Sequence, residues 1–234
     1  MKKLDKLYEG KAKVLYATDD PDHLIQYFKD EATAFDGKKK GIIQEKGILN
    51  NKISSRIFRY LEENGIDTHF VDMPNDREMV VKKLTIIPIE VVVRNVVAGS
   101  LAKRMGIEEG TVLKEAILEH YYKSDPLGDP MINEYHIKVF GLAEKEDLAK
   151  MDAAALRIND LLKKFFDDRG ITLVDFKLEF GRHGFEVLLG DEVTPDGCRL
   201  WDKSTGEKMD KDRFRRDLGK IEEGYQEVLK RVLG

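Results

Sequence analysis

Residues 173–202 read LVDFKLEFGRHGFEVLLGDEVTPDGCRLWD, and this stretch decides the fold. Apolar and charged side chains alternate from residue 174 to residue 180. A period of two predicts a β-strand with one apolar face and one ionisable face. The ionisable face carries three successive charges, those of Asp175, Lys177 and Glu179. We expect the rest of the chain to be organised around this strand.

A turn and a second apolar strand follow the charged strand. Residues 181–184 contain the glycines of the turn, and residues 185–189 return as a strand that ends at Gly190-Asp191-Glu192. This fold-back is expected to bring Glu179 close to Asp191. Two such carboxylates raise each other's pKa unless a cation lies between them, and Mg²⁺ prefers oxygen ligands when it carries nucleotide phosphates. The hairpin therefore predicts a metal and nucleotide site.

The alternative is an ordinary antiparallel strand with one solvated face, because such strands show the same alternation. Three features favour a functional face. The lysine is flanked by two acids, two more acids follow the second strand, and a turn at residues 194–197 leads directly into Arg199 and Asp202.

Composition excludes several classes of protein. A chain of 234 residues fits one large or two small domains, and its 41% hydrophobic and 36% charged residues are typical of a soluble globular protein. A net charge of −4 argues against nucleic acid as the main partner, because phosphate backbones select basic faces.

The same sequence predicts a cytoplasmic protein. Cys198 is the single cysteine, which excludes a disulfide framework and favours a reducing compartment. The sequence has no run of the ~18 apolar residues that a membrane span needs, and no signal peptide is visible behind the N-terminal lysines.

The N-terminal third predicts a β-rich unit with one main helix. Residues 7–16 are expected to form two strands around Gly10, where Lys11 and Lys13 could cover nucleotide phosphates; lysines that protect an exposed strand edge are the alternative. Further strands are expected at 24–28, 68–71 and 79–84, a turn at 31–37, and an amphipathic helix at 47–64.

The middle of the chain predicts a central strand followed by an anion site. Residues 86–97 are strongly apolar and β-branched, and Ala98-Gly99-Ser100 follows at once. With Ser100 as the N-cap of a short helix, its hydroxyl and the backbone N–H groups would lie near Arg94. The alternative is an ordinary cap beside a surface arginine.

The C-terminal part predicts three helices, at residues 133–140, 145–169 and 210–233, and a loop at 121–130. Basic residues in the first turns of the last helix oppose its dipole, which an anion would offset. We expect an α+β protein of two domains, an antiparallel N-terminal domain of residues 1–84 and an α+β domain of residues 85–234, with a nucleotide in the cleft between them.

Several segments together are similar to one family. They are LYEGKAKVLY, EATAFDG, KGILNNKIS, IIPIEVVVRNVVAGSLAKRMGIEEG, LVDFKLEFG and GDEVTPDGCRLWD. The chain resembles the SAICAR synthetases of purine biosynthesis from Leu7 to the final helix. The resemblance implies an ATP-grasp-like fold and an ATP-dependent ligase that joins L-aspartate to the carboxylate of carboxyaminoimidazole ribotide (CAIR), giving SAICAR, ADP and phosphate. It also implies a cytoplasmic enzyme, and a homodimer in which the apolar face of the last helix could meet the partner.

The resemblance also implies where ATP and magnesium bind. Glu179 and Asp191 would hold Mg²⁺ on the ATP phosphates, and Glu45 and Asp129 are candidates for further Mg²⁺. The remaining ATP-binding residues would be Lys11, Ala12 and Lys13 over the phosphates and the backbone of Lys82 to Leu84 beside adenine.

The same resemblance implies two substrate sites. Arg94, Ser100 and Arg199 would bind the 5′-phosphate of CAIR, because guanidinium groups match phosphate geometry. Asp175 and Lys177 would contact its imidazole, so the catalytic set comprises Asp175, Lys177, Glu179 and Asp191. The L-aspartate site would involve Asp36, Lys211 and Arg215.

Two alternatives remain open. One is a ligase or kinase-like enzyme of the same fold that acts on a different carboxylate. The other is a nucleotide-binding regulatory module that binds ATP without turnover.

Overall fold

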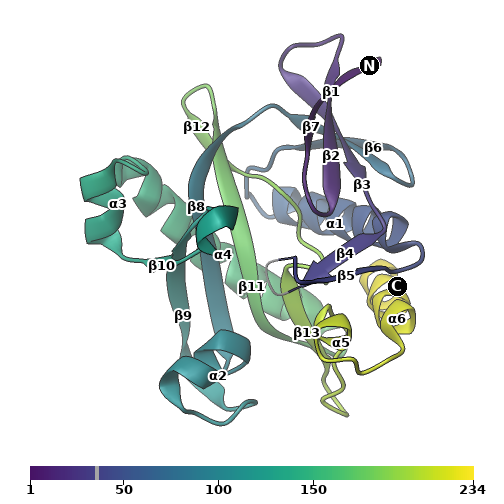
Figure 1. The fold of residues 1–234 in the computed structure, drawn as a ribbon, viewed down its shortest axis with the longest axis vertical. Coiled ribbons are helices and arrows are strands. Elements are labelled where there is room, and N and C mark those ends of the chain that lie inside the picture. Colours follow the sequence, from purple (N-terminus) through teal and green to yellow (C-terminus); the bar gives the residue numbers. More distant parts are fainter. Residues whose placement is uncertain (35–36) are drawn as a thin grey trace.

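The computed structural model, which describes residues 1–34 and 37–234, contains two large antiparallel sheets, one at the upper right of the view and the other at its centre and left (Figure 1). The five-stranded sheet has the spatial order β1 (Lys3–Glu9), β2 (Lys13–Thr18), β3 (His23–Phe28), β7 (Glu78–Lys82) and β6 (Phe70–Asn75). The six-stranded sheet runs β10 (Met131–Ile132), β9 (Val112–Tyr122), β8 (Thr85–Val96), β11 (Ile171–His183) and β12 (Glu186–Leu189), and β13 (Cys198–Asp202) also pairs with β11.

A small third sheet and the helices surround these two sheets. The third sheet pairs β4 (Glu31–Ala34) with β5 (Lys39–Ile42). The helices are α1 (Lys46–Glu63), α2 (Gly99–Met105), α3 (Glu134–Phe140), α4 (Lys145–Asp167), α5 (Asp212–Arg215) and α6 (Ile221–Leu233), with a 3₁₀ turn at Asp125–Leu127. No helix of the described chain is both long enough and apolar enough to cross a membrane.

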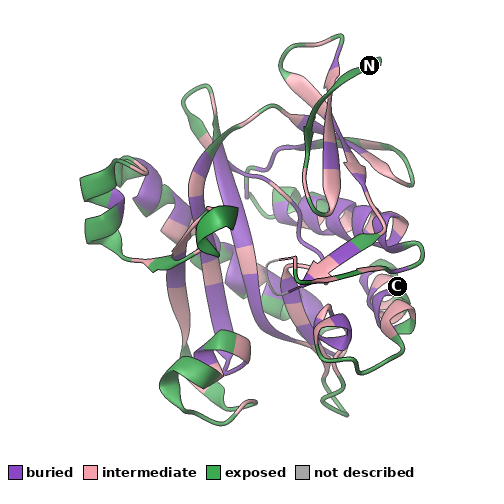
Figure 2. Cartoon of the chain, viewed as in Figure 1, coloured by how far each residue is buried: buried purple, intermediate pink, exposed green. Residues whose placement is uncertain are grey.

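The core lies between the sheets and the two long helices. Helix α1 buries Ile53, Ile57 and Phe58 almost completely, and α4 packs its own apolar face on β8 and β11. Burying each such side chain contributes roughly 1.5–3 kcal/mol. The middle parts of β8 and β11 are accordingly buried, whereas most of α3 and the outer face of α2 are exposed (Figure 2).

The predicted strand at 173–180 is confirmed as the central part of β11. It pairs with β8 on one side and with β12 and β13 on the other. Its register with β13 shifts between Leu173 and Asp175, so Leu173 and Phe176 both belong to the main core, while Val174 packs in a separate small cluster with Val96 and Ala98. The bulge therefore changes which face Val174 occupies without moving the charged positions that follow it.

Other predicted elements are confirmed or corrected. The strand at 24–28 and the helices at 47–64, 133–140 and 145–169 are confirmed within one or two residues, and the hairpin around Gly10 is confirmed with its first strand beginning four residues earlier than predicted. The turn predicted at 31–37 is wrong for residues 31–34, which form β4. The single helix predicted at 210–233 is also wrong, because Gly219 and Lys220 adopt positive φ angles and separate α5 from α6.

The chain passes from one sheet to the other at Lys83 and Leu84, between β7 and β8. The two parts share one hydrophobic cluster, which includes Phe58 and Met79 from the first part and Phe176 and Leu178 from the second. Helix α6 packs against α1 and buries Tyr225, so its apolar face is used inside the chain. A domain boundary after residue 84 remains a prediction.

Candidate active site

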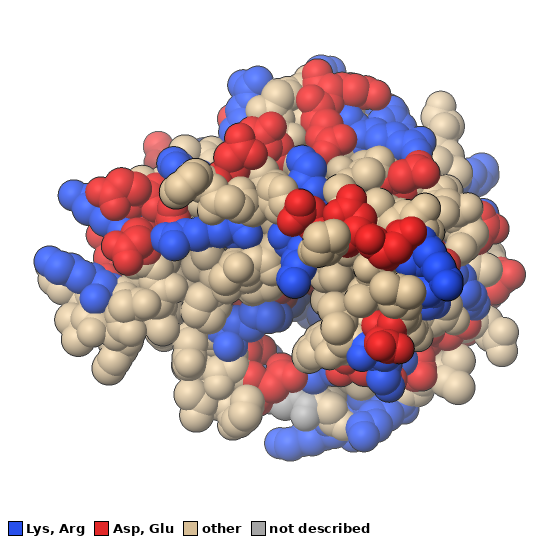
Figure 3. All heavy atoms as spheres, turned by 90° about the horizontal axis from the view of Figure 1, so that it is seen from above, with Lys and Arg blue, Asp and Glu red and all other residues tan. Residues whose placement is uncertain are grey.

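Two adjoining cavities lie where the sheets meet. The larger, which we call the carboxylate cavity, has a volume of about 540 Å³ and is lined by both sheets. The smaller, which we call the arginine cavity, measures about 310 Å³ and lies beside β8, β11 and α5. Lys11, Lys177, Asp196 and Lys211 are among the residues that line both. Seen from above, acidic and basic side chains gather around a hollow in the surface (Figure 3).

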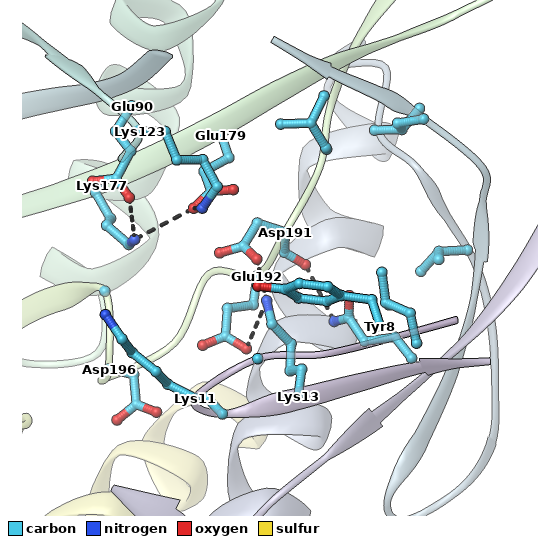
Figure 4. A pocket seen from close by; sticks show the side chains of 18 of the residues that line it. Tyr8, Lys11, Lys13, Glu90, Lys123, Lys177, Glu179, Asp191, Glu192 and Asp196 are labelled. Carbon is cyan, nitrogen blue, oxygen red and sulfur yellow. Dashed lines mark hydrogen bonds and ion pairs between the residues drawn. The ribbon is translucent and has the colours of Figure 1, made fainter. Parts of the chain in front are cut away.

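The carboxylate cavity contains the predicted acid pair. Glu179 comes from β11, and Asp191 follows β12 after Gly190, whose N–H donates to the carbonyl oxygen of Glu179 at 2.9 Å. Asp191 has a φ of 58°, a left-handed conformation that aspartate tolerates better than most residues. The side chain of Glu179 is buried, that of Asp191 is 22% exposed, and both line the cavity (Figure 4). The fold-back predicted from sequence therefore brings the two acids to one site.

Lysines hold this acid pair. Lys13 of β2 contacts Asp191, and Lys123 donates to Glu179 at 2.8 Å. Lys177 lies between Glu90 at 2.8 Å and Glu179 at 3.4 Å (Figure 4). Ammonium groups thus lie where a bound cation would meet these carboxylates.

The two acids titrate differently. Burial and the nearby charge of Asp191 raise the pKa of Glu179, although Lys177 and Lys123 oppose this shift. Burial would also raise the pKa of Asp191, but Lys13 and Lys177 outweigh it and lower that pKa to about 2. Asp191 is therefore a permanent carboxylate, whereas Glu179 depends on a neighbouring cation to stay ionised.

One end of the carboxylate cavity is apolar. Leu15, Leu24, Val81, Leu84 and Ile86 line it. Beside these side chains runs the backbone segment 82–84, in which the N–H groups of Lys82 and Lys83 already donate within the protein, to the carbonyl oxygens of His69 and Asp22 at 2.7 Å each. Such a wall beside a charged site suits a flat heterocycle attached to phosphates.

The arginine cavity is built around one buried carboxylate. Asp175 accepts hydrogen bonds from Arg94 at 2.9 Å and from Arg199 at 2.8 Å, and both partners come from strands that pair with β11. Burial raises the pKa of Asp175 against the opposing effect of the two guanidinium groups. Glu119 and Asp212 fix the other sides of the arginines, at 2.7 and 3.0 Å. The carboxylates thus orient two cations towards the cavity.

Ser100 and Gly99 complete this end of the site. Ser100 is inside α2 rather than at its N-cap, which is Ala98, and its hydroxyl accepts from Arg94 at 3.1 Å. Gly99 has a φ of +55°, and a Cβ at this position would lie 2.3 Å from a terminal nitrogen of Arg199. Only glycine lets the helix start approach that guanidinium so closely.

Asp196 lies in the wall between the cavities and is held from three directions. It accepts from Lys46 at 2.7 Å, from Asn50 at 3.1 Å and from the hydroxyl of Tyr225 at 2.7 Å. Burial opposes its ionisation, but Lys46 and Lys211 lower the pKa of Asp196 well below its usual range. It is a fixed negative charge joined to α1 and α6.

The other predicted metal ligands are placed differently. Asp129 lines the carboxylate cavity but accepts from the backbone N–H of Ser124 at 2.7 Å. Glu45 is exposed at the N-cap of α1 and lines neither cavity. Within the described ranges no three acidic, histidine or cysteine side chains form a metal-binding group. Because Mg²⁺ takes one or two carboxylates and completes its shell with phosphates and water, the Glu179 and Asp191 pair still fits it.

The comparisons with known proteins agree with this geometry. The family model for SAICAR synthetase matches residues 6–232. A phosphoribosylaminoimidazole-succinocarboxamide synthase of Clostridium botulinum is 55% identical over 232 residues, which cover 99% of each chain. The chain belongs to the SAICAR synthetase family.

Solved structures of SAICAR synthetases share the fold. A crystal structure from Ehrlichia chaffeensis has a TM-score of 0.96 and 51% identity, with 98% of each chain covered. A SAICAR synthetase in complex with ADP has a TM-score of 0.94 and 49% identity, with 97% of each chain covered. The α+β, ATP-grasp-like fold expected from the sequence is thereby confirmed.

The structure of this SAICAR synthetase family member adds residues that the sequence alone did not indicate. Lys123 and Glu90 join the acid pair, and Glu119 and Asp212 support the arginines. Lys123 directly follows β9, a strand that the sequence analysis left unassigned. Of the predicted aspartate-site residues, Lys211 and Arg215 line the arginine cavity, and Asp36 lies outside the described residues.

Proposed function

We propose that this chain ligates L-aspartate to CAIR with ATP, the reaction that gives the product named in its family's name. The observation that carries the proposal is the pair of adjoining cavities with opposite chemistry. One presents two carboxylates beside an apolar wall, and the other presents paired arginines. A reaction between a nucleoside triphosphate and a second phosphorylated molecule needs a metal-binding site and a phosphate-binding site next to each other.

ATP is proposed to occupy the carboxylate cavity. Adenine would lie against the apolar end. The backbone N–H of Leu84 would donate a hydrogen bond to it, because the N–H groups of Lys82 and Lys83 already donate within the protein. Lys11, Ala12 and Lys13 at the start of β2 would cover the phosphates, because this segment lines the cavity opposite Glu179 and Asp191. The ADP complex of a relative supports the binding of an adenine nucleotide.

Glu179 and Asp191 would hold magnesium, and Asp129 is the further candidate on the same wall. When bound, the metal neutralises phosphate charge during transfer. The fold prepares this site by keeping two carboxylates close together. Lys13 and Lys123 neutralise them until the metal binds. Glu45 is the weakest of the proposed ligands because of its exposed position.

CAIR is proposed to occupy the arginine cavity. Arg94 and Arg199, kept apart by Asp175, would bind its 5′-phosphate together with Ser100, and Lys177 would hold its carboxylate at the junction of the cavities. That carboxylate would accept the γ-phosphoryl group to give an acyl phosphate. The amine of L-aspartate, bound near Lys211 and Arg215, would then displace phosphate.

The test is an omission assay. The purified chain is incubated with Mg²⁺, ATP, L-aspartate and CAIR, each is omitted in turn, and ADP and SAICAR are followed. We expect ADP and SAICAR in equal amounts only in the complete mixture. A ligase for another carboxylate would give no SAICAR with CAIR, and a nucleotide-binding module would bind ATP without releasing ADP.

Cellular location and assembly are further proposals. We propose a cytoplasmic protein, supported by its single, buried and unpaired cysteine. We propose a homodimer, which light scattering of the purified chain would test by measuring a mass twice that of the 26.9 kDa monomer.

A further inference from the structure

Lys211 occupies a position that differs from those of the other site lysines. It precedes α5 and lines both cavities, so its amine is at the junction where the two substrates would react. Its side chain is only 14% exposed. The backbone fixes it, because its N–H donates to the carbonyl oxygen of Pro195 at 3.0 Å.

Four other lysines of the carboxylate cavity have close acidic partners, and Lys82 donates to the carbonyl oxygen of Thr68 at 3.4 Å. Lys11 pairs with Asp125, Lys123 with Glu179 and Lys177 with Glu90, each at 2.8 Å, and Lys13 contacts Asp191. Among the residues that the structure describes, the nearest carboxylate oxygen to Nζ of Lys211 belongs to Asp196, at 3.9 Å. Asp196 is itself occupied by three shorter hydrogen bonds.

The surroundings of Lys211 favour its neutral form. Burial lowers the pKa of Lys211, and the cations of Arg215 and Lys46 add to this effect, while Asp196 and Glu192 oppose it. The other charges along its cavity, on Asp175 and Arg199, are paired with each other. An amine whose pKa is lowered, and which is nearly buried and next to a fixed anion, gives up its proton more readily than an exposed lysine and can take one back as a stabilised cation.

We propose that Lys211 is the base that takes the proton from the amine of L-aspartate during amide formation. This inference rests on the proposed function of the two cavities. L-Aspartate reacts as the free amine: its nitrogen lone pair forms the C–N bond to the acyl carbon. The C–O bond to phosphate breaks with its electron pair leaving on phosphate. The proton that the nitrogen sheds passes to Nζ of Lys211, beside Asp196, and then to water.

The decisive variant is Lys211→Arg, which keeps the positive charge but cannot lose its proton at working pH. We expect its kcat with L-aspartate to fall about 10²- to 10⁴-fold, the range for loss of a general base. Replacing L-aspartate by hydroxylamine bypasses the base, since that nitrogen is weakly basic and water accepts its proton. With hydroxylamine, ADP and hydroxamate formation by Lys211→Arg should stay within a few-fold of the unsubstituted chain.

A second variant provides an independent measurement. In Lys211→Ala, methylamine in the buffer should restore part of the turnover with L-aspartate, and the low-pH limb that Lys211 contributes to the kcat profile should disappear. Lys203→Ala is the matched control, because Lys203 is exposed and pairs with Asp167 outside both cavities. Thermal melts of each variant establish that the chain remains folded.

Failure of the inference and failure of the proposed function give different results. If the unsubstituted chain releases no ADP with CAIR and either nucleophile, the proposed function is wrong. If it turns over but Lys211→Arg keeps normal activity with L-aspartate, or loses activity equally with both nucleophiles, Lys211 is not the base. Equal loss would assign it to the binding of CAIR or ATP, and a loss confined to the KM for L-aspartate, with kcat unchanged, would assign it to L-aspartate binding alone.

Discussion

The two cavities contain the same kinds of charge but arrange them in opposite ways. In the carboxylate cavity the acids face the open space, and lysines on flexible stems neutralise them. In the arginine cavity Asp175 accepts from both arginines, and Asp212 and Glu119, which do not line the cavity, hold the arginines from the other side and fix their planes. Lysine is a mobile point charge, whereas a guanidinium group held on two sides is oriented in advance. The first cavity is thus prepared for a cation and the second for an anion.

The largest expected effect comes from Glu179→Gln in the carboxylate cavity. Loss of one metal ligand should remove roughly 4 kcal/mol of transition-state stabilisation, a decrease in kcat on the order of 10³-fold. CAIR affinity, measured by calorimetry, should change little, because Glu179 does not line the arginine cavity. Glu186→Gln on the exposed part of β12 is the control. A parallel loss of CAIR binding would contradict the division between the cavities.

The reverse experiment uses Arg199→Ala in the arginine cavity. Loss of charge-assisted hydrogen bonds costs about 1.5–3 kcal/mol, so CAIR should bind about 10- to 100-fold more weakly. ADP affinity should be nearly unchanged. Arg199→Lys separates charge from geometry: it should recover only part of the affinity if the guanidinium fork matters. Isothermal calorimetry with each ligand tests both variants, and equal weakening of ADP and CAIR would refute the separate sites.

The pH dependence of stability distinguishes an acid near the arginine cavity, Asp210, from the acid Asp191 of the carboxylate cavity. Burial and the ionised Asp212 raise the pKa of Asp210 to about 7, whereas that of Asp191 is lowered to about 2. With its folded-state pKa above its unfolded value, Asp210 binds more protons in the folded protein between about pH 4 and pH 7. Its contribution to stability is present at low pH and is lost as pH rises through that window.

We therefore expect Asp210→Asn to flatten the decrease in Tm between pH 5 and pH 7.5, by several degrees. Thermal melts across this range measure the slope for both chains. An unchanged slope would mean that Asp210 does not titrate there.

The smallest expected effect concerns the rim of the arginine cavity. Arg216, which follows α5, pairs with both oxygens of Glu109 at 2.8 and 2.6 Å and so joins α5 to the segment after α2. Both side chains are partly exposed, so Glu109→Gln should cost at most about 1 kcal/mol, or about 2–4 °C in Tm. A large rise in the KM for CAIR would show that this rim closes the cavity.

The sequence was sufficient for the elements whose pattern is local. The alternation in β11 and the glycine turn after it predicted the acid pair, because a hairpin of neighbouring strands leaves little freedom in register. The break in the last helix was not predicted, because apolar residues keep the helical period across it: Phe214 and Tyr225 pack in one cluster from either side of Gly219.

Contacts between distant segments could not be predicted in this way. Asp196 is 150 residues from Lys46 and 29 from Tyr225, and no periodicity relates them. Strand β9 was unassigned because its charged and apolar residues do not alternate: Lys114 and Glu115 are adjacent and three apolar residues follow them. Lys123, just after this strand, was therefore missed. The roles of Asp196 and Lys123 can be recognised only in the folded structure, where the segments that they contact lie next to them.

The hydrogen bond between Tyr225 and Asp196 has a consequence for biosynthesis of the protein. Helix α6 is translated after all the strands, yet it holds the loop that separates the two cavities. A nascent chain still lacking α6, or one shortened before it by a nonsense codon, would therefore have both sheets but an incomplete wall between the reactants. Catalytic competence would thus be withheld from this polypeptide until α6 has been made.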